Sequence, residues 1–303
     1  MMDISKQQIS RVLLRYGSLS KVSGIGKSKY LQSPEDLLSV FSGKKIMVVD
    51  TETTGLYAHT HQITEIAAEV LDGDTFEIID SYHKKIKLTD RTRTRMECER
   101  KEREQGVKKF DVEKCLELQG YDPEDPGLKE LYDILLDFYE FNRKYPNVVI
   151  VGQNITFDIR MINTALKKID PGKTLLFKEA YDTKVFFSTF VTPALIVLKE
   201  ENDEGTKGII DKIWDKEKGR PSSRLGLILK AFDIEIQGWH GAAADVKSTA
   251  LALRKILKFI ENYSHIIDDD RFKAEQAKAF KKEYSLKDRD QKSRKDFYKK
   301  DTL

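Results

Sequence analysis

The sequence predicts an α/β fold, with buried strands, an antiparallel hairpin and amphipathic helices. Two runs of consecutive apolar residues, at 46–49 and 148–151, are typical of short strands buried on both faces. Two longer runs rich in Ile, Val and Tyr are separated by an Asp-Gly turn at 72–74, which indicates an antiparallel hairpin. Residues 128–144 and 246–260 place apolar side chains at the period of a helix.

The first strand ends in acidic residues. Ile46-Met47-Val48-Val49 runs directly into Asp50-Thr51-Glu52, and because strand side chains alternate, Asp50 and Glu52 share one face while Thr51 points to the other. Two carboxylates this close repel each other unless a cation compensates, and a hard divalent ion accepts oxygen ligands. The alternative is a strand that simply ends in acidic residues at a solvated loop, and Asp-x-Glu alone does not decide between them.

The next segment combines the hairpin, predicted from runs at 63–71 and 75–87, with a dense run of charge. Residues 84–111 contain eleven Lys or Arg against six Asp or Glu. One interpretation is a solvated helix whose charges form ion pairs. The other is a basic flap that contacts phosphates.

The second acidic position follows the strand at 148–151. Gly152-Gln153-Asn154 leads to Asp158 at the start of a predicted helix, after the carboxyl end of a strand, where sites in open α/β sheets usually lie. An acid there also suits the helix dipole, so its position alone does not prove a site. Residues 180–183 predict one more short strand and turn.

The third motif is His240-Gly241-Ala242-Ala243-Ala244-Asp245, which leads into the helix predicted from the apolar stripe at 246–260. The small residues between His240 and Asp245 allow a ligand to approach closely. A lone histidine before a helix is more often a cap or a surface residue.

Composition limits the class of protein. The chain has 303 residues, 40% hydrophobic and 34% charged, with a net charge of +3 that is too small to indicate nucleic-acid binding by itself. No apolar run approaches the ~18 residues that cross a membrane, and the N-terminus shows no signal-peptide pattern, so we expect a soluble, cytoplasmic protein that does not bind membranes. Cys98 and Cys115 lack the spacing of a zinc site.

The two ends of the chain carry weaker signals. Helices are predicted at 6–16 and 34–41, and the glycines of Gly24-Ile25-Gly26 between them suit either a DNA-binding helix-hairpin-helix or an ordinary turn. The tail, 271–303, has twelve Lys or Arg against six Asp or Glu, interleaved with aromatic residues. It suits either single-strand binding or a helix that packs on the core.

Taken together and in this order, the three motifs closely resemble those of the DEDDh (DnaQ-like) 3′–5′ exonucleases, which belong to the ribonuclease H-like superfamily. The motifs are Asp50-x-Glu52, Asn154-x-x-x-Asp158 and His240-x-x-x-x-Asp245, and Thr53-Thr54-Gly55-Leu56 continues the first of them. The resemblance implies a mixed five-stranded sheet whose second strand is antiparallel. It places the exonuclease domain at 44–265, with a charged insertion at about 89–120, a helical N-terminal extension at 1–43 and a charged helical tail at 266–303.

The resemblance also implies roles for individual residues. Asp50, Glu52, Asp158 and Asp245 would hold two divalent ions, Mg²⁺ or Mn²⁺, with Asp50 shared between them. His240 would be the general base, and Glu52 would join it in the catalytic set. The implied substrate-binding residues are Thr51, Thr53, Gly55, Leu56 and Asn154. Of these, Leu56 would pack on a base and Asn154 would orient the second motif more than touch the substrate.

The function implied is metal-dependent 3′–5′ hydrolysis of single-stranded nucleic acid to nucleoside 5′-monophosphates, with DNA slightly favoured over RNA. Its partners would be the 3′ ends of DNA or RNA strands, with replication or repair proteins as further candidates. Two alternatives remain: an exoribonuclease of the oligoribonuclease or ribonuclease T type, and a nucleic-acid-binding replication protein that uses the same fold without turnover.

Overall fold

The computed structural model describes residues 39–106, 111–201, 203–204, 206, 208–215, 220–235, 241–267, 270 and 272–275. Contacts divide the chain into two compact units. Among the described residues, one comprises those of Val40–Thr183 and Ile234–Arg254, and the other comprises those of Lys184–Asp233 and those from Lys255 on. The helix predicted at 6–16, residues 34–38 of the helix predicted at 34–41, the glycine pair between them and most of the charged tail lie outside the described residues.

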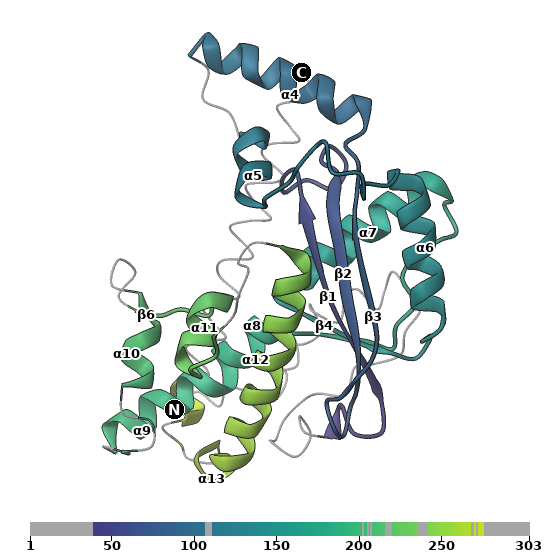
Figure 1. Ribbon diagram of the computed structural model, residues 1–303. Helices are drawn as coiled ribbons and strands as arrows, with labels where there is room; N and C mark the ends of the chain where they lie inside the picture. The colour runs from purple at the N-terminus through teal and green to yellow at the C-terminus, as the bar shows by residue number, and fades with distance from the viewer. Residues whose placement is uncertain are drawn as a thin grey trace, which may run out of the picture. The chain divides into compact units, whose positions relative to one another are not determined.

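The first unit contains a five-stranded mixed sheet in the order β3-β2-β1-β4-β5 (Figure 1). β1 pairs antiparallel with β2 and parallel with β4, β2 pairs antiparallel with β3, and β4 pairs parallel with β5. The strands are β1 (Lys45–Thr53), β2 (Ile63–Asp72), β3 (Ile78–Lys85), β4 (Val149–Gly152) and β5 (Glu179–Asp182). This topology confirms the predicted sheet, including its antiparallel second strand.

The burial of the strands follows their composition. The apolar residues of β1 from Ile46 to Val49 are buried, and β2 is buried along almost its whole length, as expected for strands covered on both faces. β3 lies at the edge and is mostly exposed, but Tyr82 is buried. The Tyr82 hydroxyl donates to the Ile134 carbonyl oxygen at 3.2 Å, which ties this edge to a helix.

Helices pack on the sheet of the first unit. α6 (Leu131–Arg143) contacts β3 and α7 (Thr156–Ile169), and α7 also contacts β1. Both helices occupy the predicted positions, as does α12 (Ala242–Asn262), whose first turns up to Arg254 belong to this unit. These helices begin close to the carboxyl ends of the strands, where the sequence predicts the site.

The charged insertion forms two helices, α4 (Asp90–Glu104) and α5 (Val112–Leu118). Arg100 and Arg103 of α4 both pair with Glu113 of α5. In this part of α4 the ion-paired interpretation of the charge is therefore correct. At the start of α4, by contrast, Arg91 forms no ion pair with a carboxylate among the described residues.

The second unit is built mainly from short helices that the sequence did not predict. They are α8 (Thr183–Phe186), which begins at the boundary, the π-helix η1 (Phe187–Val191), α9 (Thr192–Glu200), α10 (Ile209–Ile213), α11 (Leu225–Ala231) and α13 (Ser264–Ile267), with the small strands β6 (Trp214–Asp215) and β7 (Arg220–Pro221). The ring of Phe232 lies edge-on to Phe187 and Phe259, with centroids about 6 Å apart (6.0 and 6.2 Å). Among the helices that the structure describes, none has the length and apolar character required to span a bilayer.

Candidate active site

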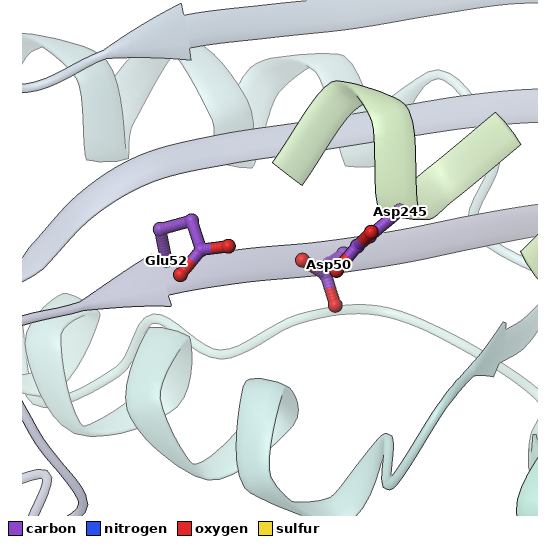
Figure 2. Close-up of side chains that lie close together, drawn as sticks. All are labelled: Asp50, Glu52 and Asp245. Atoms are coloured by element: carbon purple, nitrogen blue, oxygen red, sulfur yellow. The ribbon is translucent and has the colours of Figure 1, made fainter. Parts of the chain in front are cut away.

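Three carboxylates converge at the end of β1. Asp50 and Glu52 project from the strand, and Asp245 comes from the first turn of α12, as Figure 2 shows. One oxygen atom from each of the three lies within 4.8 Å of the other two. The alternation along β1 and the placement of α12 thus bring together residues that are far apart in the sequence.

The fourth carboxylate, Asp158 in the first turn of α7, is held by Thr51. Asp158 is only 2% exposed. Its Oδ1 accepts hydrogen bonds from the Thr51 backbone N–H at 3.0 Å and from the Thr51 hydroxyl at 2.7 Å. Because the last β1–β4 pair is Val48–Val151, this carboxylate gives the Thr51 N–H a partner beyond the end of the parallel pairing.

The site therefore combines the end of β1 with the first turns of α7 and α12. Thr51 points to the opposite face from Asp50 and Glu52 because side chains alternate along a strand. Asp158 contacts Thr51, and its charge also acts on Asp50, whereas Asp245 lies beside Asp50 and Glu52. The end of β1 lies between the starts of α7 and α12.

Burial and mutual repulsion raise the pKa values of these acids. The pKa of Asp50 lies well above its usual value, chiefly because of burial and then because of Asp158, Asp245 and Glu52. Burial, with Asp245 and Glu65, raises the pKa of Glu52 to about 7. Burial also raises the pKa of Asp158 to about 7, although the hydrogen bonds from Thr51 oppose the rise.

This donor set suits a hard divalent cation. Its ligand atoms are carboxylate oxygens, which Mg²⁺ and Mn²⁺ prefer. The raised pKa values show that the folded chain holds several acids in positions where ionisation is unfavourable without positive charge. The residues present therefore fit a metal site.

Glu65 on β2 is an acidic residue of the site that sequence reasoning missed. It is buried, lies opposite Glu52 in the β1–β2 register, and has Oε1 2.8 Å from Nε2 of His83. The same oxygen accepts the Ala243 N–H at 3.4 Å, which links β2 to the start of α12. Only the strand register could have paired Glu65 with Glu52.

Asp182 at the end of β5 was also missed. Its Oδ1 accepts the Asn154 N–H at 3.0 Å, and its charge contributes to the raised pKa of Asp158. Asn154 has a φ of 65°, a left-handed conformation that asparagine tolerates, at the turn from β4 into α7. Asp182 could have been found from the sequence, because it lies at the carboxyl end of a predicted strand, where sites in α/β sheets usually lie. The substrate contact predicted for Asn154 stays a prediction.

The loop that follows β1 contains the remaining predicted substrate residues. The buried Thr53 hydroxyl donates to the Gly55 carbonyl oxygen at 2.9 Å. Gly55 has a φ of 150°, and the imidazole of His61 occupies the space that a Cβ at this position would need. Leu56 is 63% exposed, so its side chain is accessible to a ligand. For Thr51, whose hydroxyl is bound to Asp158, the predicted substrate contact also stays a prediction.

His61 closes this loop. Its Nδ1 accepts the Tyr57 N–H at 3.2 Å, and the Tyr57 carbonyl oxygen accepts the N–H groups of Thr60 and His61 at 3.0 and 2.8 Å. Burial, together with the nearby Arg95 charge, lowers the pKa of His61, which favours the neutral imidazole. The loop is thus a compact turn and not an extended arm.

His240, the predicted general base, lies outside the described residues. The next residue, Gly241, is described, and its carbonyl oxygen accepts the Asp245 N–H at 3.0 Å. The role of His240 stays a prediction.

Comparison with known proteins gives one curated relative and a group of solved structures. DNA polymerase III PolC-type of Bacillus subtilis (strain 168) is 26% identical over 222 residues, which cover 70% of this chain and 11% of that protein. The zinc-bound E. coli ExoI–ssDNA complex matches with a TM-score of 0.51 and 20% identity over 73% of this chain and 42% of that one. E. coli Exonuclease I with a dT13 oligonucleotide matches with a TM-score of 0.50 and 19% identity over 76% and 45%.

These matches have a limited span. The chain covers about a tenth of the curated relative and less than half of either structure, and at this identity the structures show the shared fold. The decisive match is the family model RNase_T, described as "Exonuclease", which covers residues 47–253 and therefore most of the chain. That span contains all three motifs, and this chain accordingly belongs to the exonuclease family.

Proposed function

We propose that this chain is a metal-dependent 3′–5′ exonuclease that hydrolyses single-stranded nucleic acid, DNA slightly in preference to RNA, and releases nucleoside 5′-monophosphates. The observation that carries the proposal is the convergence of Asp50, Glu52 and Asp245 at the end of β1 in a member of the exonuclease family. The preference for DNA is supported by two matched structures whose descriptions include single-stranded DNA or a dT oligonucleotide.

The proposed metal ligands are the four carboxylates. Asp50 would be shared, with Glu52 and Asp245 completing one ion site and Asp158 serving the other. When bound, two divalent ions stabilise the attacking and leaving oxygens of an in-line displacement at phosphorus. Two doubly charged ions would also compensate the repulsion that raises the pKa values of these acids.

The other residues would act on the water and the nucleotide. His240, as the general base, would accept a proton from the attacking water at an imidazole nitrogen, for which the imidazole must first be neutral. The accessible side chain of Leu56 would pack on the terminal base, and the turn from Thr53 to Gly55 would lie against the sugar and phosphate. Replication or repair proteins are candidate partners, in keeping with the match to a DNA polymerase.

One assay tests the proposal against its alternatives. 5′-Labelled single-stranded DNA and RNA of the same sequence are incubated with Mg²⁺, Mn²⁺ or excess EDTA, and the product lengths are followed in time. We expect stepwise shortening from the 3′ end with either metal and none in EDTA. Asp245→Asn should be inactive, whereas Asp233→Asn, at an exposed aspartate that pairs with Lys212, should match the wild type.

The other outcomes are distinct. Faster shortening of RNA would identify an exoribonuclease of the oligoribonuclease or ribonuclease T type. Binding without shortening of either strand would identify a non-catalytic protein. Full activity in EDTA would overturn the metal-dependent mechanism, and efficient cleavage of circular single strands would overturn the exonuclease assignment.

A further inference from the structure

Basic side chains from two helices surround the loop that follows Gly55. Three of them, one from α4 and two from α7, donate hydrogen bonds to carbonyl oxygens of this loop. Their bonds are Arg95 Nη1 to Thr60 at 2.8 Å, Lys168 Nζ to Ala58 and His59 at 3.4 and 3.3 Å, and Arg160 Nη2 to Leu56 at 3.4 Å. The loop is thus placed next to positive charge that comes from the insertion helix and from the helix that carries Asp158.

Two of the cations near the loop have no acidic partner. Arg95 forms an ion pair with Glu99 at 2.8 Å. Arg91, at the start of α4, and Lys168 form no ion pair with a carboxylate anywhere in the part of the chain that the structure describes. Thr89, which precedes α4, donates its N–H to Gln62 Oε1 at 2.9 Å, so the start of α4 with Arg91 lies beside the end of the loop. Burial, and after it the charge of Arg91, lowers the pKa of Lys168, so the two cations interact unfavourably. Such a pair is relieved when an anion binds between or beside its members.

The same loop presents apolar surface. Leu56 is 63% exposed and the adjacent Tyr57 is 53% exposed. Exposed aromatic and aliphatic side chains next to cations form the combination that binds single strands, because bases stack on the first and phosphates pair with the second.

We propose that Arg91 and Lys168, which we call the basic rim, bind phosphodiester groups of a single-stranded substrate on the 5′ side of the nucleotide that is held at Leu56 and Tyr57. This inference rests on the proposed function and deepens it, because it names the residues that bind the body of the strand. It also divides α4 by role. Its first turn contacts the substrate, while Arg100 and Arg103 near its end hold α5 through Glu113.

Strand binding is the direct test. The double variant Arg91→Gln/Lys168→Gln removes both charges and keeps long polar side chains. Its matched control, Arg93→Gln/Lys167→Gln, removes two charges from exposed positions of the same two helices. Binding of a 5′-fluorescein-labelled dT 15-mer is measured by anisotropy in EDTA between 50 and 300 mM NaCl, so that metal-dependent turnover does not contribute.

We expect the rim variant to bind about 10- to 30-fold more weakly than the wild type near 0.1 M salt. The slope of log Kd against log salt should fall by about 1.4, since each phosphate contact to a single strand contributes about 0.7. The control should change both quantities much less. Equal losses in the two variants, or an unchanged salt slope in the rim variant, would overturn the proposal. Circular dichroism spectra and melting curves confirm that each variant is folded.

A second readout separates this inference from the proposed function. A chromogenic mononucleotide phosphodiester is too short to reach the rim, so the wild type and the control Arg93→Gln/Lys167→Gln should hydrolyse it with Mg²⁺ at the same rate. Absence of hydrolysis by the wild type would count against the proposed function, while the anisotropy measurement would still decide whether the rim binds strands.

Discussion

Glu52→Gln should inactivate the protein and, at neutral pH without metal, stabilise it. The substitution keeps the shape of the side chain and removes its charge. Because burial and the neighbouring carboxylates raise the pKa of Glu52 from 4.5 to about 7, the folded chain binds a proton here more tightly than the unfolded chain does. The resulting loss of stability is absent below pH 4.5, grows as the pH rises through this window and is complete above pH 7.

The magnitude follows from the shift. A displacement from 4.5 to about 7 corresponds to about 3 kcal/mol, and solvent screening of this partly exposed group lowers the expected gain to about 1 to 3 kcal/mol. For a chain of this size, that gain corresponds to a rise in Tm of about 2 to 5 °C. At pH 4.5 the variant and the wild type should melt within about 1 °C of each other.

The assay is thermal unfolding followed by circular dichroism in EDTA at pH 4.5 and 7.5. Glu77→Gln is a suitable control because Glu77 is exposed in the β2–β3 turn, where a substitution changes stability by about 0.5 kcal/mol or less. Adding Mg²⁺ should raise the Tm of the wild type more than that of the Glu52 variant. A variant that is no more stable than the wild type at pH 7.5, or equally stabilised at both pH values, would refute the electrostatic account.

Three further predictions concern the base, the second acidic position and the metal. His240→Ala should lower kcat by about 10² to 10⁴ fold, with little change in metal affinity measured by calorimetry. The control His265→Ala, at an exposed site, should leave kcat unchanged. If His240→Ala keeps the kcat of the wild type, the role of His240 is structural. Thr51→Val removes the 2.7 Å hydrogen bond to Asp158, so it should raise the pKa of Asp158 further and reduce activity about 10- to 100-fold. Thr51→Ser, which keeps the hydroxyl, should retain the activity. Unchanged activity in Thr51→Val would show that this hydrogen bond does not position Asp158. Metal affinity should increase from pH 6 to 8, because the acids with raised pKa values must lose protons on binding, and a pH-independent affinity in calorimetry would contradict the pKa shifts.

The sheet could be predicted because its strands have strong local signals. Ile46–Val49 and Val148–Val151 are continuous apolar runs, and the Asp-Gly turn at 72–74 joins two β-rich runs. The short helices of the second unit could not be predicted in the same way. η1 and α8 have only five and four residues, too few to establish a helical period. α4 is almost free of apolar residues, and its start is defined by Thr89, whose side chain accepts the Thr92 N–H.

The site was only partly accessible from the sequence. Alternation along β1 placed Asp50 and Glu52 on one face, but it could not show that Asp158 would bind Thr51, because that bond depends on where β4 stops pairing with β1. Glu65 was hidden for a similar reason. Its position opposite Glu52 depends on the register, which shifts immediately after this residue pair.

The closed turn from Tyr57 to His61 bears on the thermodynamics of strand binding. Within the turn, the Tyr57 carbonyl oxygen accepts the Thr60 and His61 N–H groups and the Tyr57 N–H donates to His61. The carbonyl oxygens of the three residues between Tyr57 and His61 accept hydrogen bonds from Lys168 and Arg95. Fewer backbone rotations therefore remain to be lost when a ligand arrives. Ordering a loop on binding opposes affinity, and a preorganised surface avoids that loss. The imidazole of His61 also packs against Gly55, so the residue that precedes Leu56 is held in place as well. A side chain at Gly55 would displace the ring and restore the conformational entropy that the turn now lacks, so its effect should appear in Kd for short oligonucleotides as well as in the stability of the fold.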